Sequence, residues 1–240
     1  MLLPLLTNGH ILKRYKRFLA DVELADGSVV TAHCPNTGSM RGCWEPGALV
    51  QISHSDNPRR KLAWTLERVD MGAGWIGVHT GRTNPVISEA LREERIPGLK
   101  GYRNVRTEVT FEAPGFPRSR FDMFLSDGPA ADVWVEVKNV TLWEGDESLS
   151  FPDAVTARGL KHLELLAEAC RQGYRGVMIY ALNRPEGACF RPADEIDPVY
   201  GKTLRRVVEA GVEVVAVRIL HLPQAMKVGD PVAVDLSWNL

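Results

Sequence analysis

The hydrophobic pattern of the chain changes near residue 80, and this change constrains the fold more than any other feature of the sequence. Before it, short alternating hydrophobic runs are separated by Gly- and Pro-rich turns, and Asp26-Gly27 is typical of a β-hairpin. The expected strands are residues 11–24, 28–33, 48–53, 62–70 and 73–79. About five short strands within ~80 residues favour a small closed β-barrel of the oligonucleotide-binding (OB) type.

Beyond this point, helical and strand periodicities alternate. Asn84-Pro85 predicts a helix with Asn84 as its N-cap and a proline in its first turn. The other expected elements are strands over 102–112, 119–125, 131–140, 174–182 and 212–220, and helices over 154–172 and 197–211. Val155 and Leu163 are expected on the buried side of the helix over 154–172. The order α-β-β-β-α-β-α-β predicts a barrel domain over 1–82 and an α/β domain over 83–240.

The composition favours a soluble protein. Hydrophobic residues make up 45% of the chain and charged residues 25%, which is ordinary for globular proteins. No apolar run approaches the ~20 residues of a membrane helix, and the N-terminal apolar stretch precedes the basic one, unlike a secretory signal. Four irregularly spaced cysteines argue against a disulfide framework or a zinc knuckle. We therefore expect a cytoplasmic protein without a membrane partner.

The net charge of −1 gives no overall attraction to nucleic acid, but the basic residues of the N-terminal part are clustered. The two clusters consist of Lys13, Arg14, Lys16 and Arg17, and of Arg59, Arg60 and Lys61. Clustered basic side chains can attract phosphate groups while the rest of the chain stays acidic. The alternative is a solvated basic strand and turn without a ligand.

A second constellation lies in the α/β part. Glu136 and Lys138 are two residues apart on one expected strand, so both side chains point to the same face. Asp122 on the preceding strand reaches them if the two strands form a hairpin. Two carboxylates and a backbone carbonyl can hold Mg²⁺, with Mn²⁺ as a substitute, while Lys138 orients or deprotonates the attacking water. This is the D…E-x-K pattern of the PD-(D/E)XK nucleases, with Asp122, Glu136 and Lys138 as catalytic residues.

Taken alone the E-x-K motif is weak, because about one is expected by chance in a chain of this size. The alternative is an exposed Glu–Lys pair on a sheet edge, with Asp122 bonded to Arg118 or Arg120. The order of elements around the motif favours the metal site.

Further residues are candidates for the same site. Glu89 is a third metal ligand or part of a solvated helix face. Arg158 and Lys161, three residues apart on a helix, contact a phosphate or form an ordinary basic surface. Asp153 is expected to be a helix cap.

Seven segments of the chain, taken together, match the sequence motifs of a known protein family in the same order. They are LLTNGHILKRYKRFLADVELADG, HCPNTGSMRGCWEPG, SHSDNPRRKLAWTLE, FDMFL, VEVKNVTL, FPDAVTARGLKHL and PADEIDPVYGKTL. Together, from about residue 4 to about residue 220, they closely resemble the sugar fermentation stimulation protein family (SfsA). The resemblance implies a DNA-binding protein with an N-terminal OB barrel and a C-terminal nuclease-like domain. It also implies a regulator of sugar metabolism, notably that of maltose.

Carried over by position, the acidic pair and the lysine of the family fall on Asp122, Glu136 and Lys138. The polar loop and the basic turn of the family fall on Asn36, Thr37, Gly38 and Ser39, and on Asn57, Pro58, Arg59, Arg60 and Lys61. Two prolines before Asp122 weaken a regular strand there, and residues 232–240 match the family less clearly.

Three functions follow as alternatives. The first is a DNA-binding protein with a Mg²⁺-dependent phosphodiesterase site, in which Tyr15, Phe18 or Trp64 stack on bases, although Phe18 is rather expected in the core. The second is a regulator that binds DNA without cutting it. The third is a protein that acts on RNA, because OB barrels bind both nucleic acids. Binding is expected to be directed at the backbone, with little sequence specificity.

Overall fold

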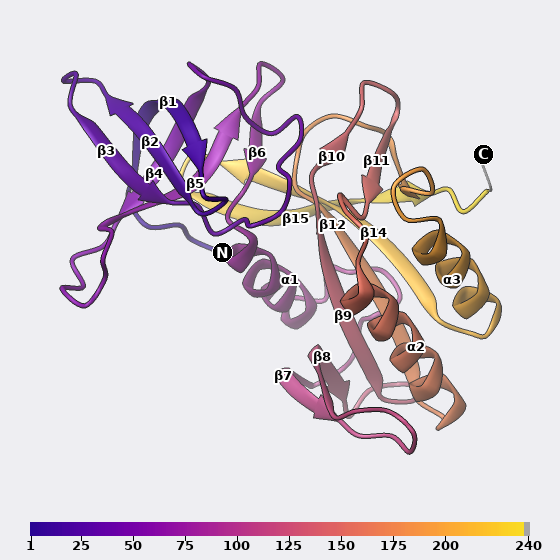
Figure 1. The fold of residues 1–240 in the computed structure, drawn as a ribbon. Coiled ribbons are helices and arrows are strands. Elements are labelled where there is room, and N and C mark those ends of the chain that lie inside the picture. Colours follow the sequence, from indigo (N-terminus) through magenta and orange to yellow (C-terminus); the bar gives the residue numbers. More distant parts are fainter. Residues whose placement is uncertain (238–240) are drawn as a thin grey trace.

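The computed structural model describes residues 1–237 and places them in two β-sheets. The first sheet is a barrel formed by the N-terminal part of the chain (Figure 1). The second is a long mixed sheet flanked by helices. Residues 238–240, the last three of the predicted α/β domain, lie outside the described residues.

The barrel is closed in the manner of an OB fold. Its strands are β1 (Leu6–Tyr15), β2 (Leu19–Leu24), β3 (Val29–His33), β4 (Leu49–His54), β5 (Trp64–Asp70) and β6 (Trp75–Gly77). Their order is β3-β2-β1-β4-β5-β6, and a parallel pairing of β3 with β5 closes the sheet. Alternating residues such as Ile11, Val22 and Ile52 fill the interior. The expected OB-type barrel is therefore confirmed.

The segment 11–24, expected as one strand, is two strands joined by a turn. Lys16 and Arg17 occupy this turn with φ values of 50° and 65°. Positive φ at two successive residues matches the twist of a tight hairpin, which lets β1 fold back on β2.

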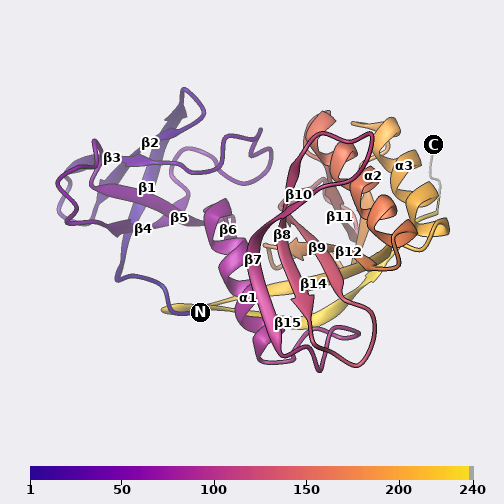
Figure 2. The ribbon, with the colours of Figure 1, turned by 90° about the horizontal axis from the view of Figure 1, so that it is seen from below.

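The α/β domain contains the elements that follow the barrel. They are η1 (Thr80–Arg82), α1 (Thr83–Arg92), β7 (Asn104–Phe111), β8 (Ser119–Ser126), β9 (Val133–Val140), β10 (Leu142–Trp143), β11 (Ser148–Phe151), α2 (Ala157–Arg171), β12 (Arg175–Leu182), β13 (Cys189–Pro192), α3 (Pro198–Glu209), β14 (Glu213–Leu222) and β15 (Ala225–Val234). The strand order is β10-β11-β13-β15-β14-β12-β9-β8-β7. Helix α1 covers one face of the sheet and α2 and α3 cover the other (Figure 2).

The expected order α-β-β-β-α-β-α-β appears as α1-β7-β8-β9-α2-β12-α3-β14, with four further strands. Three details differ from expectation. The N-cap of α1 is Arg82, and Asn84 lies inside the helix, where its side chain has another partner. Val155 is exposed because α2 begins only after it, at a cap formed by Thr156.

Hydrogen bonds join the two domains closely. The buried Arg68 of β5 donates to the carbonyl oxygens of Leu222 and Pro223 at 2.8 and 2.9 Å. Arg184 after β12 donates to the Thr141 carbonyl at 2.8 Å and to the Gly42 carbonyl at 3.4 Å. The barrel therefore sits in a fixed orientation on the α/β domain.

No helix among residues 1–237 is both long enough and apolar enough to cross a membrane.

Candidate nuclease-like site

Asp122 lies where β8 and β9 separate. The two strands pair from Leu125–Val133 to Met123–Val135, and the pairing then stops. Beyond this point, the N–H of Val137 on β9 donates to Asp122 Oδ2 at 2.8 Å. Asn84 of α1 donates to Asp122 Oδ1 at 2.7 Å. The carboxylate of Asp122 thus replaces a backbone carbonyl in the ladder and is fixed between helix and strand.

Glu136 of β9 is the second acid of the site, and it is only 3% exposed. Its Oε1 accepts a hydrogen bond from Lys138 Nζ at 2.6 Å and is also in contact with His162 Nδ1 of α2. Its Oε2 is buried and has no partner among the described residues. A buried carboxylate oxygen without a donor is unusual in a folded protein, because leaving it unpaired costs free energy. The lone pairs of this oxygen are thus not used by any donor within the described residues.

The charges of the site shift the pKa values of the two acids in opposite directions. Burial and the nearby negative charge of Glu136 raise the pKa of Asp122 to about 6. Burial also opposes ionisation of Glu136. The hydrogen bond from His162 and the positive charge of Lys138 nevertheless lower its pKa below the usual value. Glu136 is therefore firmly ionised, and Asp122 is the acid that gains a proton first.

A cleft of about 880 Å³ between α1 and β7 leads to Asp122. Asn84, Ser88 and Arg92 border it on the helix, and Thr107 borders it on the strand. The cleft gives the carboxylate access to solvent and to a ligand.

Glu89 borders the same cleft, but its carboxylate contacts the N-terminal ammonium group of Met1. Arg95 is a second, more distant partner, at 3.9 Å. The role of Glu89 as a third metal ligand stays a prediction.

The residues present suit a small oxygen-seeking cation. Within residues 1–237 no group of three His, Cys, Asp or Glu is arranged to hold a metal ion. Mg²⁺, however, takes few protein ligands and keeps several waters. Asp122, Glu136 through its free Oε2, and the Val137 carbonyl would then hold it. The unpaired Oε2 is the feature of the site that fits such a cation.

A second, basic cleft of about 470 Å³ lies on the α2 side of β8. Arg158, Lys161 and His162 of α2 line it together with Arg118 and Arg120. Arg158 and Lys161 make no ion pair within the described part of the chain. The structure thus brings these two predicted phosphate contacts next to His162, which touches Glu136.

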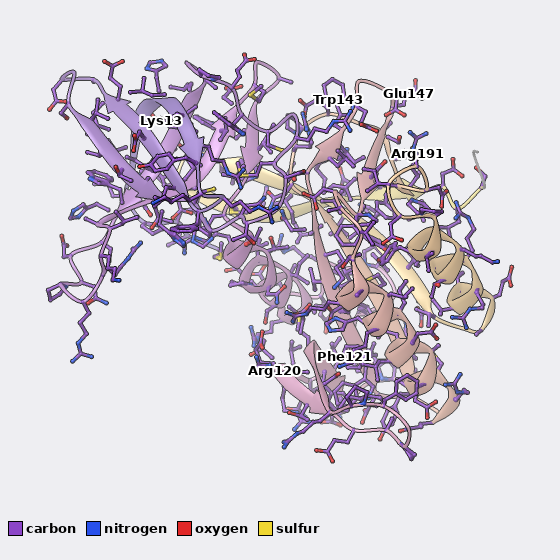
Figure 3. All side chains as sticks on the ribbon, in the orientation of Figure 1. Lys13, Arg120, Phe121, Trp143, Glu147 and Arg191 are labelled. Atoms are coloured by element: carbon purple, nitrogen blue, oxygen red, sulfur yellow. The ribbon has the colours of Figure 1, made fainter. Side chains whose placement is uncertain are left out.

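Asp122 does not pair with the neighbouring arginines, so that alternative is wrong. Arg118 and Arg120 instead pair with Glu112 at 3.1 Å and with Glu108 at 2.8 Å. Figure 3 shows Arg120 on β8, in the outer part of the α/β domain. The exposed Glu–Lys pair is also wrong, because β9 lies inside the sheet between β8 and β12.

His162 is the site residue that sequence reasoning missed. The sequence feature that could have indicated it is the position of His162 next to Leu163, on the buried side of an amphipathic helix. Such a position is unfavourable for histidine unless the ring has a partner. The partner, Glu136, lies 26 residues earlier and is brought near only by the fold.

Four of the predicted nucleic-acid contacts in the barrel have structural partners, and Arg14 and Asn36 are the first two. Arg14 donates to the carbonyl oxygens of Arg17, Asn36 and Gly38, at 2.7 to 3.0 Å. The buried Asn36 accepts from the Gly38 N–H at 2.8 Å. These bonds hold the loop at 36–38 against the β1–β2 turn.

Ser39 is the third of these residues. Its N–H and its hydroxyl both donate to Asp153 Oδ2 at 3.0 Å, which ties the barrel to the segment before α2. The expectation that Asp153 is a helix cap is therefore wrong. Its carboxylate accepts hydrogen bonds from the barrel domain instead.

The remaining predicted basic contacts of the barrel are mostly exposed. Lys16, Arg17, Arg59 and Lys61 are exposed, whereas Arg60 donates to the Thr65 hydroxyl at 2.6 Å. Arg60 and Lys61 line a cleft of about 280 Å³ together with Phe18, His33 and Leu62. Two residues of the second basic cluster thus border the same cleft as Phe18, which directly follows the first cluster in the chain.

Comparison with known proteins identifies the family. The model of the SfsA N-terminal OB domain matches residues 12–78, and that of the sugar fermentation stimulation protein RE domain matches residues 81–225. The chain belongs to the sugar fermentation stimulation protein (SfsA) family. An SfsA homologue of Geobacter metallireducens is 50% identical over 228 residues, which cover 95% of this chain and 96% of that protein. One of Geobacter sulfurreducens is 49% identical and covers 96% and 97%.

A solved structure shares the whole architecture. Pyrococcus furiosus SfsA in complex with Ca²⁺ superposes with a TM-score of 0.84 at 24% sequence identity, covering 98% of both chains. The SfsA fold, an OB barrel followed by an α/β sheet domain, therefore extends over this chain.

Proposed function

We propose that this SfsA protein binds nucleic acid and hydrolyses phosphodiester bonds at Asp122, Glu136 and Lys138 with a divalent cation. The observation that carries the proposal is the carboxylate of Glu136. One oxygen is held by Lys138 and His162, and the other is buried, unpaired and beside Asp122. This arrangement agrees with the D…E-x-K pattern of the PD-(D/E)XK nucleases.

The chemistry of the side chains fits phosphodiester hydrolysis. Bound Mg²⁺ or Mn²⁺ would polarise a phosphate oxygen and offset the negative charge that develops during hydrolysis. Asp122 and Glu136 would hold the cation, and His162 would keep the Glu136 carboxylate in place. Lys138, 2.6 Å from Glu136, would orient the attacking water or stabilise the developing charge.

A related protein supports a divalent cation. Pyrococcus furiosus SfsA was solved in complex with Ca²⁺, a cation that prefers oxygen ligands as Mg²⁺ does. Its fold is that of the present chain, although only 24% of the aligned residues are identical.

The proposed substrate is DNA, held by its backbone with little regard to sequence. Arg158 and Lys161 offer free charges beside the site, and Lys16, Arg17 and Lys61 offer them on the barrel. Binding through such contacts weakens steeply as salt displaces the protein from phosphates. RNA is the alternative substrate, and the proposal places the protein in the cytosol.

Two substitutions test the catalytic part. Glu136→Gln and Asp122→Asn should lower the cleavage of labelled DNA in Mg²⁺ or Mn²⁺ at least about 100-fold, because each removes a charge that the cation needs. Both should also weaken Ca²⁺ binding measured by calorimetry. Glu209→Gln, an exposed carboxylate at the end of α3, is the matched control and should change neither quantity.

The catalytic proposal fails if the unmodified protein leaves single-stranded and duplex DNA and RNA intact with both cations. A regulator that binds DNA without cutting it, and acts on sugar metabolism such as that of maltose, is the second candidate. It is favoured by the ion pair of Lys138 with Glu136, which neutralises the site without a metal. Under that reading, Asp122→Ala and Lys138→Ala leave both the DNA affinity and the sugar-dependent phenotype unchanged.

A further inference from the structure

Phe18 is the most exposed of the Phe, Tyr and Trp side chains among residues 1–237, with 45% of its surface open to solvent. Sequence reasoning favoured a core position for it, because it alternates with the buried Ala20 and Val22. That expectation is wrong, since the chain turns at Lys16 and Arg17 just before it. The ring therefore presents apolar surface to solvent beside a basic segment of the chain.

The backbone holds Phe18 in place while the ring stays free. Its carbonyl accepts from the N–H of Cys34 at 2.8 Å, which joins the turn to the end of β3. Arg14 bonds to the Arg17 carbonyl one residue earlier, at 2.7 Å. A ring on such a fixed turn loses little further freedom when it binds a ligand.

The surroundings of the ring combine apolar surface with positive charge. Phe18 and Leu62 line the cleft of about 280 Å³ beside His33, Arg60 and Lys61. Neither Lys61 nor the nearby Lys16 and Arg17 form an ion pair among the described residues. A flat ligand that carries negative charge beside it would match this surface.

The other aromatic candidates for stacking are engaged. The Tyr15 hydroxyl donates to Asp21 at 3.1 Å, and Lys13 lies over the Tyr15 ring. Trp64 is half-buried against the barrel core and packs edge-to-face with His54 at a centroid distance of 4.8 Å. Phe18 is thus the ring with a free face.

We propose that Phe18 stacks on an unpaired base, so that the barrel prefers single-stranded nucleic acid to duplex. This inference rests on the proposed nucleic-acid binding and names the form of the substrate. A base inside a duplex cannot stack on a side chain without leaving its own stack, whereas a base in a single strand can. Arg60 and Lys61 would hold the phosphates on either side of the stacked base.

The fold connects this cleft to the nuclease-like site. Arg14 bonds both the turn that bears Phe18 and the loop at 36–38. The next residue, Ser39, bonds to Asp153, which lies just ahead of α2 and its basic cleft. The turn that bears Phe18 is therefore joined through the loop at 36–39 to the segment ahead of α2.

Binding of three fluorescent ligands tests the proposal: a single-stranded DNA of about 12 nucleotides, the matched duplex, and the same strand with abasic sites. Phe18→Ala should weaken binding of the single strand about tenfold and leave the duplex within about twofold. Phe18→Trp should restore the affinity. The unmodified protein should bind the abasic strand as weakly as Phe18→Ala binds the normal one.

Val29→Ala is the matched control, because Val29 is also exposed and apolar on the barrel but lies at the start of β3. Its affinity for the single strand should not change. Circular dichroism should show the same melting for every variant, since both side chains are exposed.

The outcomes separate this inference from the proposed function. If the unmodified protein binds neither single-stranded nor duplex nucleic acid, the proposed function fails. If it binds and Phe18→Ala binds the single strand equally well, only stacking at Phe18 is overturned. A loss for Val29→Ala as large as that for Phe18→Ala would also overturn it.

Discussion

Asp122 is both a structural acceptor and a predicted metal ligand. Its two oxygens accept from the N–H of Val137 and from the amide of Asn84. Burial beside Glu136 nevertheless makes its charge unfavourable in the folded protein, which raises its pKa to about 6. The residue is therefore needed for hydrogen bonding and costly when ionised.

The raised pKa of Asp122 predicts how stability depends on pH. The usual value is 3.8, so between about pH 4 and pH 6 the folded protein keeps a proton that the unfolded chain releases. Its contribution to the free energy of unfolding therefore falls as the pH rises through this window, by at most about 3 kcal/mol, and is constant above it. The stability of Asp122→Asn relative to the unmodified protein should rise over the same window.

Urea denaturation at pH 4, 5, 6 and 7 in the presence of a chelator measures this difference. Glu209→Gln should show no such trend, because its carboxylate is exposed at the end of α3. A difference between Asp122→Asn and the unmodified protein that does not change with pH would contradict the raised pKa.

Spacing along the chain was enough to find part of the site. Glu136 and Lys138 lie on one face because they are two residues apart on a strand, and Asp122 reaches them through the β8–β9 hairpin. His162 and Phe18 could not be placed in the same way. The role of His162 depends on a contact between α2 and β9, and the exposure of Phe18 depends on a turn without glycine.

At the scale of elements, α2 and α3 start at one shared acceptor. Asp197 Oδ1 accepts from the N–H of Tyr200 at 3.0 Å and so caps α3. Its Oδ2 accepts from the N–H of Thr156 at 2.9 Å, while the Thr156 hydroxyl caps α2 by accepting from Gly159 at 3.0 Å. Because α2 bears His162, this cap also fixes the nuclease-like site.

Asp197→Ala should lower the free energy of unfolding by about 2–3 kcal/mol, since it removes the cap of α3 and also the acceptor of the half-buried Thr156 N–H. Thr156→Ala should cost about 1 kcal/mol, and Thr156→Ser, which keeps the hydroxyl, should cost less. Urea denaturation measures all three changes. An Asp197→Ala protein as stable as Thr156→Ser would refute the shared cap.

The long elements were predictable because their periodicity extends over many residues. The short ones were not. Strand β10 has only two residues, and β13 pairs in parallel with β11 and β15, which are distant in sequence. Strand β15 contains Gly229, Asp230 and Pro231, which break the strand pattern, and it forms through its pairing with β14 and β13.

At the scale of the molecule, the two domains are joined by buried arginines. Arg68 is 1% exposed and is the donor to two carbonyl oxygens just after β14. Arg184 makes the reciprocal contact from the α/β domain to Gly42. Such bonds are directional, so they fix how the Phe18 surface faces the nuclease-like site.

Arg68→Ala should lower the free energy of unfolding by about 3 kcal/mol, because it removes two hydrogen bonds between the domains and the packing of a buried side chain. The thermal transition should then broaden or divide, with the barrel unfolding first. Scanning calorimetry, together with hydrogen exchange of the β1–β5 amides, measures both effects. Arg171→Ala, which removes an exposed ion pair with Glu168, is the control and should cost less than about 1 kcal/mol.

The hydrogen bond from Val137 to Asp122 also constrains how the sequence of the site can evolve within the family. A descendant that no longer cut nucleic acid would still need an acceptor for this N–H, since leaving it unpaired costs about 1–3 kcal/mol. Selection for folding alone would therefore keep the aspartate. Lys138, whose ammonium group bonds among the described residues only to Glu136, has a structural reason to persist only while that buried carboxylate is present. Joint loss of the lysine and the glutamate, and not loss of the aspartate, is the change that would mark a lineage in which the proposed cleavage had been lost.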